Sequence, residues 1–298
     1  MTVDPSPLSA GLYWGDAAYL IKPAADPDYL NCLSEILELE RPDIVLIGTD
    51  VELEILSKNR ADLESRFGVK ILVSDPRVIA IADDKYLTYE FFRDIGGSPP
   101  ASALPERAGD VEALVEQVGF PLIIKPRVGA RSIGVSKAHN RKELDLALAD
   151  REGLVVQECI GSDSGEYTAG VVVFDGKAQA AIVMRRDLRD GNTYRAFVTV
   201  DPVLHDAVMD FGEKLAPYGP ANFQFRLDKD GRPRVFEING RFSGTTPLRA
   251  LAGFNEVEMC VRFVLEGAPV QQPVIEPITI LRHWSETVVR DADAVLLS

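Results

Sequence analysis

The spacing of apolar residues divides the chain into two regions. In the first region, apolar residues recur at helical spacing over Asp28–Glu40, and Pro42 follows. The apolar runs 43–48 (DIVLIG) and 69–74 (VKILVS) are typical of buried strands. This alternation of helix and strand predicts a parallel sheet with flanking helices over residues 1–80.

The second region begins after a helical segment at 83–94 and a breaker cluster at 96–100 (GGSPP). From there, short apolar or alternating runs separated by turns predict a sheet-rich α+β region. The expected strands cover 121–125, 154–158, 169–174, 178–184, 195–200, 221–227 and 233–238, and helices are expected near 141–149, 205–216 and 256–266.

The segment Ala221–Arg241 (ANFQFRLDKDGRPRVFEINGR) has the pattern of a β-hairpin. Asp230-Gly231 lies between two alternating runs, which is typical of a two-residue type I′ turn. The register that follows pairs Gln224 with Glu237, and Asn222 with Asn239.

Side chains alternate along a strand, so the two faces of this hairpin differ in character. We expect Phe223, Phe225, Phe236 and Ile238 to dock on the core, and Asn222, Gln224, Arg226, Glu237, Asn239 and Arg241 to share the other face. A carboxylate with neighbouring amide oxygens is a set of hard ligands that suits Mg²⁺. The pattern therefore predicts a metal site at Gln224, Glu237 and Asn239. An ordinary amphipathic hairpin with a solvated polar face is the alternative.

The formal net charge is −14, which repels nucleic acid and anionic membranes at long range, so neither is expected as a partner. The chain has no run of about 18 or more uncharged apolar residues, and its N-terminus lacks the pattern of a signal peptide. A soluble, cytoplasmic protein is expected. Cys32, Cys159 and Cys260 are scattered in apolar sequence, which is typical of reduced core thiols.

Positive residues gather at two places in this acidic chain. Lys125, Arg127 and Arg131 form the first group, and the run 185–189 (RRDLR) forms the second. An anionic ligand requires such groups near it. For each residue the alternative is an ordinary solvated surface charge.

The hairpin resembles the metal-binding strands of the ATP-grasp superfamily, most of all the synthetase halves of the carbamoyl-phosphate synthase large subunit and their stand-alone relatives. Gln224 and the string 237–244 (EINGRFSG) carry the resemblance. It implies that Gln224, Glu237 and Asn239 hold Mg²⁺, with Mn²⁺ as an alternative, on the phosphates of ATP. It also implies that Arg241 stabilises the transferred phosphoryl group.

The resemblance extends from about Tyr19 to the C-terminus and includes two lysines and a flap. Lys85, which opens a helix, and Lys125, in the run 121–126 (PLIIKP), resemble the family's phosphate-contacting lysines. The glycine-containing segment 127–135 resembles its flap, because glycines let backbone N–H groups approach phosphate oxygens closely. The flap residues implied to face the nucleotide are Gly129, Arg131, Ser132 and Gly134.

The run 154–160 (LVVQECI) resembles the strand that joins the two ATP-grasp lobes. The resemblance places Gln157, Glu158, Cys159 and Ile160 at the adenine, and Glu166 at the ribose hydroxyls, from which a carboxylate accepts hydrogen bonds. The basic loop 185–195 lies where relatives contact their substrate. Arg185 and Arg186 are therefore implied to meet a substrate carboxylate with their planar forks.

The implied fold is an α+β ATP-grasp fold, in which two α+β lobes clasp ATP, preceded by a truncated α/β Rossmann-like domain. The domains are expected at 1–80, 81–160 and 161–298, with the metal site in the last. Relatives begin with a glycine-turned βα unit before the segment that resembles Thr2–Tyr13, so the first strand is expected to be missing. The strand at 43–48 would then border a gap, and a homodimer or a covering segment would compensate for the open edge.

The implied activity is that of an ADP-forming carboxylate–amine ligase. ATP would convert a small carboxylate into an acyl phosphate, and a small amine would displace the phosphate. Lys85, Lys125 and the flap would hold the α- and β-phosphates, and Arg241 would meet the developing charge. Two alternatives stay open: a carbamoyl-phosphate-synthase-like kinase of bicarbonate or carbamate, and a non-catalytic nucleotide-binding module.

Overall fold

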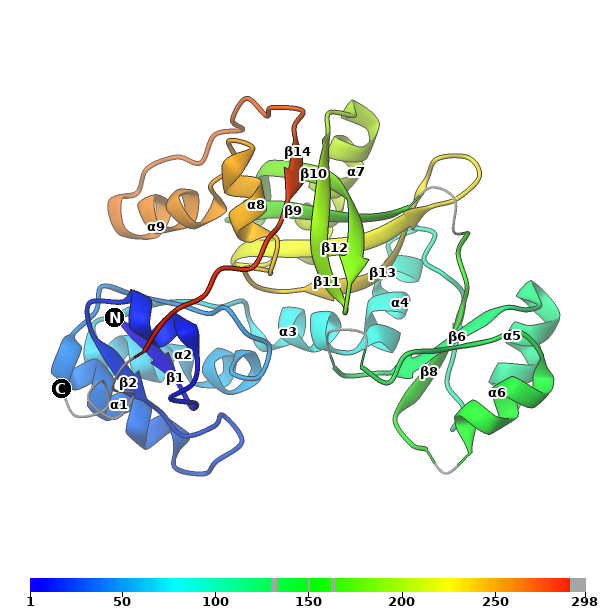
Figure 1. Cartoon of the computed structure of the whole chain (residues 1–298), viewed down its shortest axis with the longest axis horizontal. Coiled ribbons are helices and arrows are strands. Elements are labelled where there is room, and N and C mark those ends of the chain that lie inside the picture. The colour runs from blue at the N-terminus through cyan, green and yellow to red at the C-terminus, as the bar shows by residue number, and fades with distance from the viewer. Residues whose placement is uncertain (130–132, 150, 162–164, 290–298) are drawn as a thin grey trace.

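The computed structural model describes residues 1–129, 133–149, 151–161 and 165–289. These residues form three parts (Figure 1). The N-terminal part, drawn in blue, and a small lobe at the right of the view flank a large central sheet.

The N-terminal part contains two parallel pairs of strands. These are β1 (Thr2–Asp4) with β2 (Ala18–Leu20), and β3 (Ile44–Leu46) with β4 (Lys70–Leu72). The connections are the 3₁₀ helix η1 (Ala10–Trp14) and the α-helices α1 (Tyr29–Glu40) and α2 (Leu53–Phe67). Leu37, Leu63 and Ile71 are buried together in the core of this part. The predicted alternation of strands and helices is confirmed.

The described N-terminal strands do not form one continuous sheet, because β1 pairs only with β2, and β3 pairs only with β4. A groove of about 630 Å³ lies between them, lined by residues from Met1–Asp4, Ser9–Leu12 and the segment 42–46. The strand expected to border a gap, β3, therefore borders a groove. That this groove is the place of a missing first strand stays a prediction.

The small lobe is an antiparallel sheet of four strands in the order β5-β8-β6-β7. One face is packed against two helices, through a core that includes Leu114, Leu122 and Leu144. The strands are β5 (Ser102–Ala103), β6 (Leu122–Pro126), β7 (Ser136–Ala138) and β8 (Leu154–Glu158), and the helices are α5 (Asp110–Val118) and α6 (Arg141–Leu148).

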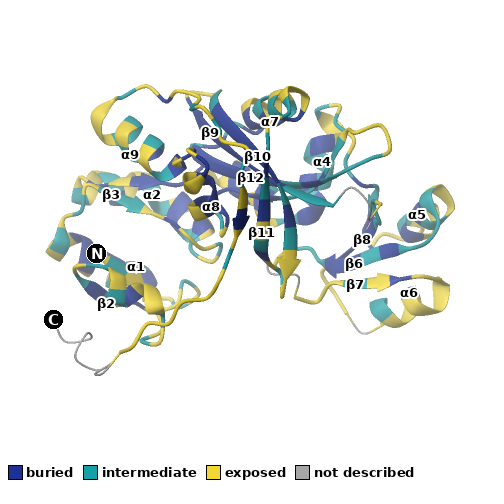
Figure 2. Ribbon diagram, turned by 45° about the horizontal axis from the view of Figure 1, so that its top comes forward, coloured by how far each residue is buried: buried dark blue, intermediate teal, exposed yellow. Residues whose placement is uncertain are grey.

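The large sheet has six antiparallel strands in the order β13-β12-β9-β10-β11-β14. Figure 2 shows that buried residues run along its central strands, whereas the helices at the periphery turn exposed residues outward. The strands are β9 (Glu166–Phe174), β10 (Lys177–Arg189), β11 (Asn192–Thr199), β12 (Gly219–Leu227), β13 (Pro233–Asn239) and β14 (Thr279–Leu281).

Helices cover both faces of this sheet. On one face lie α7 (Pro202–Leu215), α3 (Pro76–Asp83) and α4 (Lys85–Asp94), where Val78 and Phe92 share a core with Phe223. On the other face lie α8 (Thr246–Leu251) and α9 (Glu256–Glu266), which pack over Phe174 and Met184. The expected boundary at residue 80 falls within α3, and both α3 and the following helix α4 contribute to the core of the large sheet. None of the described helices has the length and apolar character that crossing a bilayer requires.

Side-chain caps explain where two of these helices begin. Asp84 accepts hydrogen bonds from the backbone N–H groups of Tyr86 and Leu87, so α4 begins at Lys85. Asp201 caps α7, whose first residue is proline, which needs no hydrogen-bond partner for its nitrogen. As a result, Lys85 lies in the first turn of α4.

The hairpin of β12 and β13 has the predicted register, because Gln224 pairs with Glu237 and Asn222 pairs with Asn239. The predicted two-residue turn is wrong. Asp228 N donates to Arg232 O at 3.0 Å, and Gly231, with a φ of 78°, ends a three-residue loop. The extra loop residue shifts the register by one, and a bulge in β13 shifts it back.

The bulge also exchanges two side chains between the faces of β13. Val235 is buried in the core with Phe223, Phe225 and Ile238. Phe236 instead lines the cleft described below, so its expected place in the core is wrong. The predicted positions of the other three apolar residues are confirmed.

Residues 185–189 belong to β10, so the expectation of a basic loop is wrong. The turn to β11 consists of Asp190 and Gly191, whose φ angles of 51° and 73° fit a two-residue type I′ turn. Because successive side chains of a strand point to opposite faces, Arg185 and Arg186 are separated.

Candidate nucleotide and metal site

A cleft of about 360 Å³ lies between the small lobe and the large sheet. A concave site with apolar walls and a few convergent polar groups is typical of small-molecule binding. The apolar wall includes Pro100, Ile123, Pro126, Ile133, Val135, Ile160, Leu188 and Phe236, and the charged or amide residues are Lys85, Lys125, Lys137, Gln157, Glu158, Glu166, Arg186, Gln224, Arg226 and Glu237.

Lys125 lines this cleft from β6 and is only 5% exposed. Its Nζ donates to Gln157 Oε1 at 2.8 Å and to Phe236 O at 3.3 Å. Burial lowers the pKa of Lys125 to about 8, an effect that Glu237 opposes and Lys85 strengthens. Among the described residues no carboxylate forms an ion pair with this ammonium, so an anionic ligand would stabilise it.

Lys85 ties the start of the flap to α4. Its Nζ donates to Gly129 O at 2.7 Å and to Arg127 O at 3.4 Å. The Arg127 guanidinium in turn donates to the cap residue Asp84 at 2.5 Å. Gly129 has a φ of 134°, a value that favours glycine. The described part of the flap thus leaves β6 at a point held by two charged side chains.

The strand that joins the two lobes uses its side chains within the protein. Gln157 accepts from Lys125 and donates through Nε2 to Ser102 Oγ at 2.9 Å. Glu158 Oε2 accepts from Ala101 N at 3.0 Å and from Arg234 Nη2 at 2.7 Å. Both residues line the cleft, and within the protein the Gln157 amide and Glu158 Oε2 have partners.

The three cysteines are free, as predicted, but they differ in burial. Cys260 lies on the buried side of α9, and burial raises the pKa of its thiol. Cys159 is half-buried and lines the cleft together with Ile160. Its expected place in the core is therefore wrong, because β8 ends at Glu158 and the next residues turn toward the cleft.

Glu166, at the start of β9, is held by two arginines. Arg186 Nη2 donates to Glu166 Oε1 at 2.5 Å and to Gln224 Oε1 at 2.6 Å. Arg226 Nη2 donates to Glu166 Oε2 at 3.2 Å. Two guanidinium groups thus face the Glu166 carboxylate, and Glu237 lies beyond Gln224. With its lysines, the described lining of the cleft holds more cationic than anionic side chains, which suits an anion.

The three predicted metal ligands meet on the polar face of the hairpin. Gln224 Nε2 and Asn239 Nδ2 donate to the same oxygen, Glu237 Oε1, at 3.0 Å and 3.3 Å. Among the described residues, no three His, Cys, Asp or Glu side chains are grouped to hold a metal. One carboxylate with two amides fits a hard cation that takes further ligands from water or phosphate, as Mg²⁺ does.

Arg241 follows β13 and joins the hairpin to the N-terminal part. Its Nε and Nη2 donate to the two carboxylate oxygens of Asp50 at 2.5 Å each. Its Nη2 also donates to Asn239 Oδ1 at 3.0 Å, and its Nη1 donates to Phe242 O at 2.8 Å. The side chain is 11% exposed. The guanidinium thus lies next to a proposed metal ligand and in a fixed orientation.

The predicted site residues separate into four groups. Those that line the cleft are Lys85, Lys125, Gly129, Gln157, Glu158, Cys159, Ile160, Glu166, Arg186, Gln224 and Glu237. Asn239 and Arg241 continue the hairpin beside it, and Gly134 contacts Pro126 at the base of the flap. Arg185 is not among the described lining residues, because it lies on the other face of β10, where it pairs with Asp187 at 3.1 Å. Arg131 and Ser132 lie outside the described residues.

Two features beside the site escaped the sequence analysis. Asp50 is 191 positions away from Arg241, and nothing in its local sequence indicates the contact. A buried ion pair of Arg249, on α8, and Glu256, on α9, lies against the large sheet at 2.7 Å. Gly170, inside an apolar strand, was a usable indication of that pair, because a glycine in a strand often marks a close approach.

Family profiles match most of the chain outside the N-terminal part. A profile described as an ATP-grasp domain matches residues 82–207. A profile described as ATP-grasp in the biosynthetic pathway with Ter operon matches residues 150–287. Both matches include the strand that joins the two lobes, and the second includes the whole hairpin.

Curated proteins with similar sequences include carbamoyl phosphate synthase large chains. That of Pseudomonas putida is 26% identical over 288 residues, which cover 88% of this chain and 26% of that protein. That of Methanosarcina mazei is 25% identical over 272 residues, which cover 84% of this chain and 24% of that protein. The chain therefore spans about a quarter of the length of these relatives.

Solved structures with a similar fold cover nearly the whole chain. The N5-carboxyaminoimidazole synthetase of Staphylococcus aureus complexed with ADP matches with a TM-score of 0.72 and 16% identity, over 92% of this chain and 72% of that one. The biotin carboxylase–ATP complex of Campylobacter jejuni matches with a TM-score of 0.67 and 18% identity, over 85% and 62% of the chains. At these identities the likeness establishes the fold alone.

Proposed function

Because this chain belongs to the ATP-grasp superfamily, we propose that it is a Mg-ATP-dependent ligase that activates a carboxylate as an acyl phosphate for attack by an amine or similar nucleophile. The observation that carries the proposal is the meeting of Gln224, Glu237 and Asn239 beside the cleft that contains the Lys125 ammonium. Hard oxygen ligands next to a buried cation suit a polyphosphate with its metal ion.

The nucleotide would lie in the cleft with its base against the apolar wall. Ile160, the backbone that follows Glu158 and Glu158 Oε1 would face the adenine, because the Gln157 amide and Glu158 Oε2 already have partners. Lys125 would donate to the phosphates, and Lys85 would approach them from the first turn of α4. The bound Mg²⁺ would be held by the three hairpin ligands and would neutralise charge on the phosphate oxygens.

The two arginines would bring the reacting groups together. A carboxylate and a triphosphate repel one another, so positive groups must lie on both sides of the bond that forms. Arg186 lines the cleft next to Gln224, and Arg241 is oriented by Asp50 and Asn239. Arg241 would stabilise the charge that develops on the transferred group, and Arg186 would bind the carboxylate with its planar fork.

The experiment that tests this function is ADP release from Mg-ATP in the presence of pools of carboxylic acids and amines. We expect one acid to stimulate ADP release, and we expect hydroxylamine to trap the acyl phosphate of that acid as a hydroxamate. Release of AMP and pyrophosphate would contradict the mechanism. So would the absence of hydroxamate with every acid that stimulates ADP release.

A second candidate is a carbamoyl-phosphate-synthase-like kinase of bicarbonate or carbamate, which the likeness to carbamoyl phosphate synthase large chains favours. This activity predicts ADP release that depends on bicarbonate, with no carboxylic acid added. A non-catalytic module would instead bind nucleotide without releasing ADP under either condition.

The metal assignment has its own test in Glu237→Gln. This change removes the single anionic ligand and leaves only amides, so Mg-dependent turnover should be lost while the fold persists. Glu116→Gln, at an exposed position of α5, is the matched control and should retain activity. Near-normal turnover by Glu237→Gln would refute the assignment of this residue as a ligand.

A further inference from the structure

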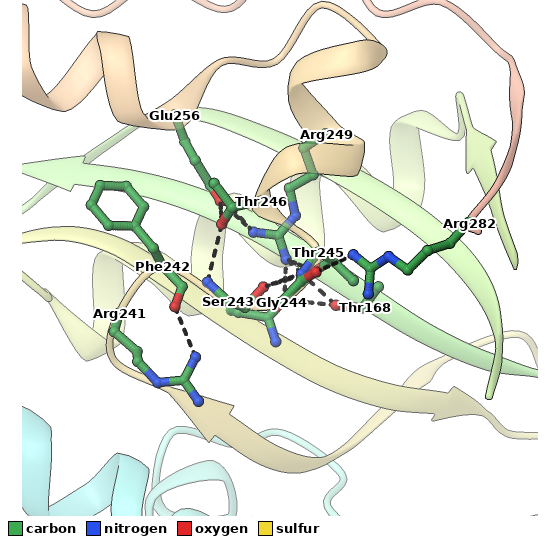
Figure 3. Close-up of polar contacts among 11 residues, drawn as sticks. Thr168, Arg241, Phe242, Ser243, Gly244, Thr245, Thr246, Arg249, Glu256 and Arg282 are labelled. Atoms are coloured by element: carbon green, nitrogen blue, oxygen red, sulfur yellow. Dashed lines mark hydrogen bonds and ion pairs between the residues drawn. The ribbon is translucent and has the colours of Figure 1, made fainter. Parts of the chain in front are cut away.

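A buried ion pair packs against the large sheet, in contact with Asn222 of the metal hairpin (Figure 3). Arg249, on α8, donates through Nη1 to both carboxylate oxygens of Glu256, on α9, at 2.7 Å and 3.0 Å. The two side chains are 1% and 0% exposed. Such a buried pair is costly to desolvate unless further hydrogen bonds complete it.

The second nitrogen of the Arg249 fork provides these contacts. Its Nη2 donates to Asn222 Oδ1 and, at 2.9 Å, to Thr245 Oγ1, and it lies 3.5 Å from Thr168 Oγ1. The guanidinium rests on the backbone of β9, since a Cβ at Gly170 would lie 2.6 Å from its Nη1. The pair therefore has one fixed position against the sheet.

The same network fixes the loop Ser243–Thr246. Thr245 Oγ1 lies 2.7 Å from Ser243 Oγ, and Ser243 N donates to Thr246 Oγ1 at 3.0 Å. Thr246 Oγ1 donates in turn to Glu256 Oε1. The loop leads into α8, which has only six residues, and so short a helix depends on tertiary contacts for its position.

The loop is continuous with the site. Arg241 Nη1 donates to Phe242 O at 2.8 Å, next to the loop, and Arg241 Nη2 donates to Asn239 Oδ1 at 3.0 Å. Figure 3 shows Arg241 and Phe242 at one end of the loop, and Arg249 and Glu256 at the other. An uninterrupted chain of hydrogen bonds and covalent bonds thus leads from the buried pair to a proposed metal ligand.

We propose that Arg249, fixed by Glu256, is a positioning residue that holds the loop Ser243–Thr246 and thereby orients Arg241 and Asn239. The inference rests on the proposed function, because it assigns Asn239 to the metal. A pair that served stability alone would leave metal binding unchanged in every variant that folds. If Arg249 is a positioning residue, a variant that disturbs the loop lowers metal affinity more than a control variant that loses the same stability.

Two valine substitutions separate these roles. Thr245→Val and Thr168→Val each remove one buried hydroxyl that faces Arg249 Nη2, but only Thr245 belongs to the loop. The probe is Mn²⁺ binding in the presence of ADP, followed by electron paramagnetic resonance, with ADP affinity measured separately without metal. Thr245→Val should weaken Mn²⁺ binding several-fold and leave metal-free ADP binding unchanged. Thr168→Val should bind Mn²⁺ as the unmodified protein does.

Arg249→Lys and Gly170→Ala move or replace the guanidinium itself. We expect each to lower Mn²⁺ affinity about 10-fold, the low end for loss of an outer-shell partner. With an identified acid, each should lower kcat while the KM for ATP changes little. Urea unfolding of all variants shows which of them are folded under the assay conditions. If the Arg249 variant is not folded, Thr245→Val alone tests the positioning role.

Equal Mn²⁺ affinity for Thr245→Val and the unmodified protein would overturn the positioning role. Equally weakened binding by Thr245→Val and Thr168→Val would overturn it too, because the effect would then follow general stability. Failure of the proposed function looks different, since the unmodified protein would then release no ADP with any carboxylic acid, or would bind neither ADP nor Mn²⁺ with ADP.

Discussion

One face of the large sheet carries arginine–glutamate pairs in two settings. Arg186 and Glu166 line the cleft, with side chains 9% and 13% exposed, and share their hydrogen bonds with other cleft residues. Arg249, on α8, and Glu256, on α9, lie between these helices and the sheet, with side chains 1% and 0% exposed. The residue types are the same, and the difference lies in what completes each pair.

The pair of Arg249 and Glu256 is completed by protein groups. The Arg249 guanidinium makes a second contact with the carboxylate, and it also donates to an asparagine oxygen and a threonine oxygen. The cleft around the Arg186–Glu166 pair is lined by more cationic than anionic described side chains, and the buried Lys125 is one of the cations. The buried pair therefore finds its partners within the protein, with only Arg249 Nε left without one among the described atoms of that guanidinium, whereas the cleft is arranged to be completed by an anion. The following predictions test this difference in order of expected size.

The largest effect is expected for Glu256→Gln. The substitution keeps the shape of the side chain but leaves the Arg249 charge buried without a carboxylate. The free energy of unfolding should therefore fall by about 3–5 kcal/mol, measured by urea denaturation. The double variant Arg249→Met with Glu256→Gln should lose less than the single one, because no unpaired charge remains. A single-variant loss below about 1 kcal/mol, the range of exposed pairs, would remove the distinction between the two settings.

Lys125→Ala tests the ligand-completed region. The ammonium has no described carboxylate in ion-pair contact, so its loss should affect nucleotide binding more than folding. We expect ADP binding to weaken by about 1.5–3 kcal/mol, the contribution of a hydrogen bond to a charged group. Isothermal titration calorimetry measures the change, and Lys142→Ala, at an exposed position of α6, serves as the control. An unchanged dissociation constant would count against a phosphate-binding role.

Glu166→Gln is the cleft counterpart of Glu256→Gln. Water can enter the cleft and solvate the two arginines, so the free energy of unfolding should fall by only about 1 kcal/mol, the upper range for accessible ion pairs. The same urea denaturation measures it. A loss equal to that of Glu256→Gln would mean that both pairs are structural units, and the comparison would fail.

The hairpin register was predictable because a period of two residues constrains both strands at once. The prediction survived an error in the turn, since the three-residue loop and the bulge shift the register in opposite directions. The place of Phe236 was not predictable, because a bulge is selected by the packing of Val235 into the core and not by local sequence. The local sequence pattern was therefore enough to predict which site residues pair across the hairpin, but not on which face of β13 every side chain lies.

Contacts between distant segments account for the other features that the sequence did not predict. Asp50 reaches Arg241 only because the loop after β3 lies beside the hairpin in the folded chain. Arg249 lies in a helix of six residues, too short to display a helical period. The separation of Arg185 from Arg186 required knowledge that the basic run is a strand. Motifs within one strand or one hairpin could therefore be predicted from the sequence. The residues that tertiary packing brings into contact with them could not.

The smallest effect concerns pH, and it follows from the lowered pKa of Lys125. In the free protein this pKa is about 8 instead of 10.5, because burial disfavours the ammonium. A bound phosphate would favour the charged form, so binding above pH 8 requires proton uptake. Between about pH 7.5 and 8.5 the dissociation constant for ADP should rise about threefold, and Lys125→Arg should abolish this rise because arginine stays charged.

Stability should change in the opposite direction over the same range. Between the lowered pKa of the folded state and the ordinary lysine pKa, the unfolded chain binds more protons than the folded one. The contribution of Lys125 to the free energy of unfolding without nucleotide therefore rises with pH above about 8. Urea denaturation at several pH values measures the total, and the difference from Lys125→Met isolates this contribution. A difference that falls with pH would mean that Lys125 already has an anionic partner within the protein, and the cleft would then resemble the closed Arg249–Glu256 unit.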